Sequence, residues 1–102
     1  MNRLLPLSPA ALHILLALAG EDMHGYGIMQ EVARHDYKLG PGTLYDNLQR
    51  LIDQGLVQEI ASDDPRRRIY RLNAQGRKLL AAEISRLEGV LKEARLHLRR
   101  SS

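Results

Sequence analysis

An apolar repeat in the last quarter of the chain constrains the fold more than any other feature. Its members follow one another at intervals of 4, 3, 4, 3 and 4 positions: Leu80, Ile84, Leu87, Leu91, Ala94 and Leu98. This spacing is typical of a coiled-coil seam, and it predicts one long helix from Ala74 to about Arg99, which Asn73 can cap. At ~1.5 Å per residue this helix is about 38 Å long, whereas a compact domain of about 100 residues has a radius of gyration of ~13 Å.

A helix of this length should extend beyond its own domain. We therefore expect residues 1–73 to form one domain and residues 74–102 to form a dimerisation helix. In that interpretation, a second copy of the chain covers the seam and makes a homodimer. The alternative is that the first part of the helix packs on its own domain and the end frays.

The composition excludes several classes of protein. Hydrophobic residues make up 44% and charged residues 26% of the 102 residues, which is too apolar for a disordered chain and too charged for a membrane protein. The longest apolar stretch, Ala10 to Ala19, is interrupted by His13 and is too short to cross a membrane. With no recognisable secretory signal, we expect a cytoplasmic protein. The absence of cysteine excludes disulfides and thiolate zinc sites.

Three helices are predicted in the first half of the chain. Ser8-Pro9 is a typical helix start, and apolar residues at helical spacing continue to about Ala19. A second helix is expected over about 25–35. After a glycine-proline turn at 39–42, a third helix is expected over about 43–54, because its apolar residues form one stripe.

The start of the third helix allows two interpretations of its polar residues. Thr43 and Asp46 have the spacing of a capping box, and we favour that role for Asp46 over a contact with a base. Tyr45 lies at the edge of the apolar stripe. Its ring can pack in the core, or its hydroxyl can reach a phosphate, and the sequence does not decide between them.

Two short strands are expected after the third helix, so the predicted fold is not purely helical. Residues 56–61 and 67–72 alternate like strands, and residues 62–65 between them have turn chemistry. Three helices, a two-stranded hairpin and a long last helix predict a mainly α fold, a winged helix-turn-helix with a C-terminal dimerisation helix.

The charges of this predicted wing favour a nucleic-acid partner. Arg66, Arg67 and Arg68 adjoin the turn, with Arg71 further along the strand, and a guanidinium group can donate two hydrogen bonds to one phosphate. The alternative is a solvated charge run, partly neutralised by Asp63 and Asp64. On the third helix, Arg50 could contact guanine or phosphate, and Asn47 or Gln49 could contact adenine.

Three blocks of sequence resemble the PadR family of bacterial transcriptional regulators. They are His24-Gly25-Tyr26-Gly27-Ile28, Gly42-Thr43-Leu44-Tyr45, and Arg67-Arg68-Ile69-Tyr70-Arg71-Leu72 with Gly76-Arg77. The resemblance implies a homodimeric winged helix that binds a pseudo-palindromic operator in double-stranded DNA, usually as a repressor. It also implies that Thr43, Tyr45 and Tyr26 contact the DNA backbone. Asp46 departs from the proline that the family most often has there. The candidate DNA-binding residues are Tyr26, Lys38, Thr43, Tyr45, Asn47, Arg50, Arg66, Arg67 and Arg68.

Other functions have less support from the sequence. We expect no enzyme, cofactor or metal, because the histidines at 13, 24, 35 and 97 lack ligand spacing and no phosphate loop is present. His24 is better placed to cap the second helix. A winged-helix module that binds a protein instead of DNA is the main alternative, and a basic tail lying on a membrane is a third. The resemblance allows a small-molecule effector, which the sequence does not identify.

Overall fold

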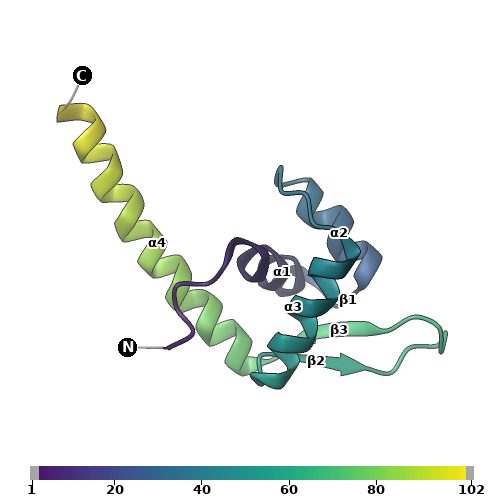
Figure 1. Ribbon diagram of the computed structural model, residues 1–102. Coiled ribbons are helices and arrows are strands. Elements are labelled where there is room, and N and C mark those ends of the chain that lie inside the picture. Colours follow the sequence, from purple (N-terminus) through teal and green to yellow (C-terminus); the bar gives the residue numbers. More distant parts are fainter. Residues whose placement is uncertain (1–2, 101–102) are drawn as a thin grey trace.

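The protein has a helical body with a small sheet on one side and a long helix that leads away from both (Figure 1). A computed structural model describes residues 3–100, so the ends of the expected ranges 1–73 and 74–102 lie outside the described residues. The predicted order of three helices, a hairpin and a long last helix is confirmed. In chain order the elements are α1 (Pro9–Gly20), β1 (Met23–His24), α2 (Gly25–Ala33), α3 (Pro41–Asp53), β2 (Val57–Ile60), β3 (Ile69–Leu72) and α4 (Ala74–Arg100).

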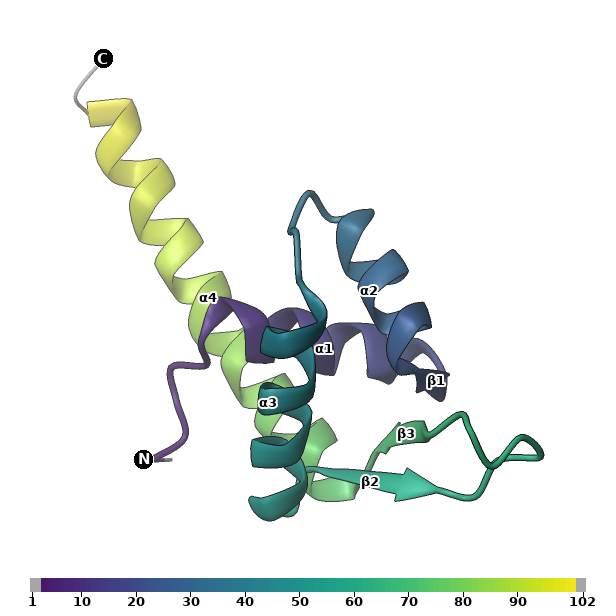
Figure 2. The same cartoon turned by 45° about the vertical axis from the view of Figure 1, so that its right-hand side comes forward.

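Helix α1 is the centre of the body and packs against α2, α3, α4 and β3 (Figure 2). It begins where the sequence predicts, because the Oγ of Ser8 accepts a hydrogen bond from the backbone N–H of Ala11 at 3.1 Å. Helix α2 ends at Ala33, slightly before the expected His35. The apolar residues with essentially no exposed surface are Ile14, Leu15, Leu18, Ile28, Val32, Leu44 and Leu48.

The start of α3 differs from the prediction. The helix begins at Pro41 with Gly40 as its N-cap, and no side chain caps it. Thr43 therefore lies inside the first turn, and the capping box expected for Thr43 and Asp46 is wrong. Proline fits this start because its fixed φ suits the first helical position and it has no N–H that needs a partner. The carbonyl of Thr43 instead accepts a hydrogen bond from the side-chain amide of Asn47 at 2.8 Å.

The sheet has one strand more than the predicted hairpin. Strands β2 and β3 pair antiparallel, with Val57 opposite Leu72, and are each shorter than expected. The short strand β1 pairs with the other edge of β3, with Met23 opposite Tyr70, so the order is β1-β3-β2. A strand of two residues is too short for any periodicity to indicate it.

The junction between β3 and α4 is tied closely to the end of α3. The side-chain oxygen of Asn73 accepts a hydrogen bond from the N–H of Gly76 at 2.9 Å, which confirms the predicted cap, and its amide donates to the carbonyl of Gly55 at 2.8 Å. Gly76 lies so near Leu56 that a Cβ atom there would overlap the Leu56 carbonyl oxygen. A side chain at position 76 would therefore separate α4 from this junction.

Helix α4 lies partly in the core and partly outside it. Leu79 and Leu80 are buried in the core of their own domain, so Leu80 has little surface left for the partner contact that we predicted. Further along, Leu91 is 51% exposed and Leu98 is 70% exposed. The overhang gives the protein extents of 56 × 28 × 21 Å. Within residues 3–100, no helix is both long and apolar enough to cross a membrane.

A buried glutamate on α4 holds the segment before α1. The Glu83 side chain is 1% exposed, and its carboxylate accepts hydrogen bonds from the backbone N–H of Leu7 at 2.8 Å and from the guanidinium of Arg86. The hydrogen bonds from Arg86 lower the pKa of Glu83, and they outweigh the opposite effect of burial.

The two glycines of α4 should respond to alanine in opposite ways. Gly76→Ala should destabilise the protein by about 1–3 kcal/mol, because the new methyl group meets a backbone carbonyl that cannot move freely. Gly89→Ala, in open space on the same helix, should stabilise it by about 0.5–1 kcal/mol through helix propensity. Urea unfolding followed by circular dichroism measures both. Equal stability of the two variants would contradict the close packing described at Gly76.

Glu83→Gln should make stability depend less on pH. Because the folded-state pKa of Glu83 is lowered from its ordinary value of 4.5, the carboxylate stabilises the fold fully above that value and progressively less as the pH falls through the lowered one. The variant should therefore be less stable than the original protein at neutral pH, and the difference should shrink in acid. Urea unfolding at several pH values tests this. Glu88→Gln is the control, since Glu88 is exposed on the same helix, and an identical pH dependence of both variants would refute the role of Glu83.

Candidate nucleic-acid interface

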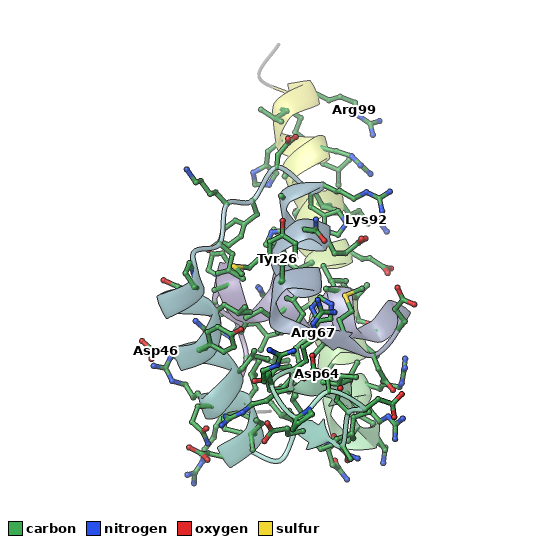
Figure 3. The ribbon with its side chains drawn as sticks, turned by 90° about the vertical axis from the view of Figure 1, so that its right-hand side faces the viewer. Tyr26, Asp46, Asp64, Arg67, Lys92 and Arg99 are labelled. Atoms are coloured by element: carbon green, nitrogen blue, oxygen red, sulfur yellow. The ribbon has the colours of Figure 1, made fainter. Side chains whose placement is uncertain are left out.

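The wing consists of β2, β3 and the loop of residues 61–68 between them, which is its tip. A recess opens between the start of α2, the start of α3 and this tip. Its volume is about 380 Å³, and it brings together five of the residues predicted to bind DNA, from three separate segments of the chain. Figure 3 looks onto this side of the molecule, with Tyr26 and Arg67 labelled near its centre. The lining residues are His24, Gly25, Tyr26, Tyr45, Arg66, Arg67, Arg68 and Tyr70.

The start of α2 forms one wall of the recess. The Nδ1 atom of His24 accepts a hydrogen bond from the N–H of Gly27 at 3.1 Å, which confirms the predicted capping role of this histidine. The ring of Tyr45 lies directly over Gly25, where a Cβ atom would overlap the tyrosine oxygen. Glycine at position 25 therefore allows α3 to place a phenol against the first turn of α2.

The tyrosines of the recess differ in exposure. Tyr26 is 62% and Tyr45 is 48% exposed, so both rings present a large part of their surface to solvent. Tyr70 is 3% exposed and lines the recess from β3. Burial raises the pKa of the Tyr70 hydroxyl, which therefore stays protonated near neutral pH.

The three arginines of the wing tip are only partly neutralised. Arg66 approaches Asp64 at 3.4 Å and Arg68 approaches Glu59 at 3.2 Å, both at exposed positions. The side chain of Arg67 has no partner among residues 3–100. Exposed ion pairs contribute only about 0–1 kcal/mol, so an incoming anion can displace these carboxylates at small cost.

Arg71 does not belong to this cluster, although we expected it to extend the charge of the wing. Its guanidinium donates to both carboxylate oxygens of Asp22, with the shortest distance 2.8 Å. These hydrogen bonds lower the pKa of Asp22. Arg71 therefore joins β3 to the loop after α1.

The other predicted contact residues lie outside the recess. Lys38 is exposed in the connection between α2 and α3, and Thr43 is exposed in the first turn of α3. Asn47 uses its amide within α3, and together with Arg50 it lines a shallow groove formed with residues of α1 and the segment before it. None of these four side chains lines the same recess as the wing arginines.

Gly25 and Tyr70 complete the recess, and neither is among the residues predicted to bind DNA. The alternation of β3 offers a signal for Tyr70, because the strand places this residue inward between two others that face outward or lie half-buried. Nothing in the sequence alone indicates that Tyr45 lies against Gly25. Within the described part of the chain, no group of three acidic or histidine side chains could hold a metal ion.

A family model matches most of the chain, and a curated transcriptional regulator is similar to it. The model described as "Transcriptional regulator PadR-like family" matches residues 14–82. Transcriptional regulator Rv3488 of Mycobacterium tuberculosis is 39% identical over 84 residues, which are 80% of this chain and 78% of Rv3488.

Solved structures confirm the winged-helix fold with its long last helix. A PadR family transcription regulator of Clostridium difficile R20291 has a TM-score of 0.81 at 23% identity, covering 89% of this chain and 99% of its own, and supports the fold alone. A transcriptional regulator of Clostridium thermocellum has a TM-score of 0.73 at 26% identity, covering 83% of this chain and 88% of its own.

Proposed function

This chain belongs to the PadR-like family of transcriptional regulators, and we propose that it binds a pseudo-palindromic operator in double-stranded DNA as a homodimeric repressor. The observation that supports DNA binding most directly is the recess. Exposed tyrosines from α2 and α3 lie there beside three arginines of the wing. Such a surface offers phosphate both planar guanidinium groups and neutral hydroxyl donors.

In the proposed complex, the first turns of α3 enter the major groove and the wing follows the adjacent backbone. Arg67, whose side chain has no partner among the described residues, is the first candidate for a phosphate contact, and Arg66 and Arg68 exchange their exposed carboxylate partners for phosphates. Tyr26 and Tyr45 donate hydroxyl hydrogen bonds to the backbone from the opposite wall. The proposed activity is DNA binding without catalysis. It would take place in the cytoplasm, where bacterial DNA lies.

The homodimer would form along the part of the seam on α4 beyond the core, at the half-buried Leu87 and the exposed Leu91, Ala94 and Leu98, because Ile84 packs partly against the core. Leu91 and Leu98 have half or more of their surface exposed, and a second copy of the helix would remove this apolar area from water. A two-fold axis then places the two α3 helices in major grooves about 34–36 Å apart, or a multiple of that distance. An inverted repeat in the operator follows from this symmetry.

Removing the charge of the wing tip should weaken binding to every DNA sequence. Arg66, Arg67 and Arg68 changed together to alanine should lower affinity and flatten the dependence of log K on log salt by about 0.9 for each phosphate that the protein no longer neutralises. Fluorescence anisotropy with a labelled duplex at several salt concentrations measures this. The control changes Lys78, Arg95 and Arg100 to alanine, which removes the same charge from exposed positions of α4. An unchanged salt slope, or equal effects in both variants, would refute the assignment of the wing.

Charges in the seam should separate the dimer. Leu87→Asp with Leu91→Asp should give folded monomers that bind the operator much more weakly, because one half-site cannot replace two. Sedimentation measures the mass and anisotropy the affinity. The control, Ser85→Asp with Lys92→Asp, adds carboxylates to exposed positions of α4 outside the seam and should remain dimeric. A seam variant that stays dimeric would place the interface elsewhere.

A further inference from the structure

The outward surface of α3 has an unpaired carboxylate near the start of the helix. Asp46 is exposed, and its side chain makes no hydrogen bond or ion pair with any residue from 3 to 100. Figure 3 shows it at the outer edge of the molecule, on the α3 side. It directly follows Tyr45, whose ring lines the recess. The carboxylate is therefore available to a partner at the end of α3 that would enter the groove.

Among residues 3–100, Asp46 neither caps a helix nor packs in the core. Gly40 is the N-cap of α3 and no side chain caps it, so Asp46 has no capping role. Its side chain has no role in the core either, because it points away from the buried stripe formed by Leu44, Leu48 and Leu51. A carboxylate has only acceptor atoms at neutral pH and repels phosphate, so it cannot bind the DNA backbone.

The neighbouring amides of α3 are already engaged. The amide of Asn47 donates to the carbonyl of Thr43 at 2.8 Å, and that of Gln49 donates to Asp53 at 3.0 Å. Asp46 differs from both, because its carboxylate makes no hydrogen bond with a described residue. In helix-turn-helix proteins, the residues near the start of the recognition helix contact base edges.

We propose that Asp46 reads a cytosine in the major groove by accepting a hydrogen bond from its N4 amino group. Cytosine itself presents this donor and no acceptor in the major groove. Guanine presents N7 and O6, thymine presents O4, and adenine presents its amino group beside N7, so each of these places an acceptor near the carboxylate. The inference rests on the proposed function, since it requires α3 to lie in the major groove of an operator.

Selection of bound duplexes from a random pool tests the inference. The original protein should select one fixed cytosine per half-site, and Asp46→Asn should replace that preference with adenine, because asparagine pairs with adenine N6 and N7. Asp53→Asn is the matched control. It removes the same charge from the same outward face, about 10 Å further along the helix, and should leave base selection unchanged.

Affinity for single duplexes gives the second measurement. Replacing the selected cytosine with thymine should weaken binding of the original protein by about 5- to 150-fold and should affect Asp46→Asn much less. An operator selected identically by the original protein and by Asp46→Asn would overturn the inference and leave the proposed function intact. If the original protein selects no sequence and binds no duplex at low salt, the proposed function itself is refuted.

Discussion

The junction between β3 and α4 fixes the geometry on which the rest of the molecule depends. Asn73 hydrogen-bonds both to Gly76 and to the carbonyl of Gly55, and Gly76 lies against the backbone of Leu56. The hydrogen bonds of Asn73 and the close approach allowed by Gly76 therefore hold α4 against the segment that follows α3. Because the proposed dimer forms through α4 and the proposed reading of DNA occurs through α3, this junction would set the distance between the two half-sites.

On the side that we propose faces DNA, acidic side chains partly neutralise the arginines, and this suits selective binding. Wing arginines are opposed by Asp64 and Glu59, and α3 presents Asp46 and Asp53 outward. In the proposed complex, these carboxylates would weaken the sequence-independent attraction to the phosphate backbone, which depends on net neutralised charge. Discrimination between DNA sequences would then depend more on base contacts that only one sequence can satisfy.

Local signals predicted much of the fold, and contacts between distant segments account for what was missed. Ser8 and Asn73 cap their helices as expected, because a cap depends on neighbouring residues alone. The sequence-based start of α3 was wrong because proline can begin a helix without a side-chain cap. Strand β1 exists through its pairing with β3, and Glu83 is buried through its contact with Leu7, which is 76 positions away. The arginines of the wing tip could be identified from the sequence as candidates, but their convergence with tyrosines of α2 and α3 needed the tertiary structure.

Strand β1 limits which part of the wing could adjust to its target. Met23 and His24 of β1 pair with Tyr70 and Ile69, the two residues of β3 next to the loop, so β3 has a neighbour on each side there. Beyond it, residues 61–68 form a loop whose turn is organised locally by Asp64, through bonds to Arg66 and Arg67. Induced fit would therefore be confined to residues 61–68 of the wing. DNA grooves of different width could be accommodated there without moving the helices.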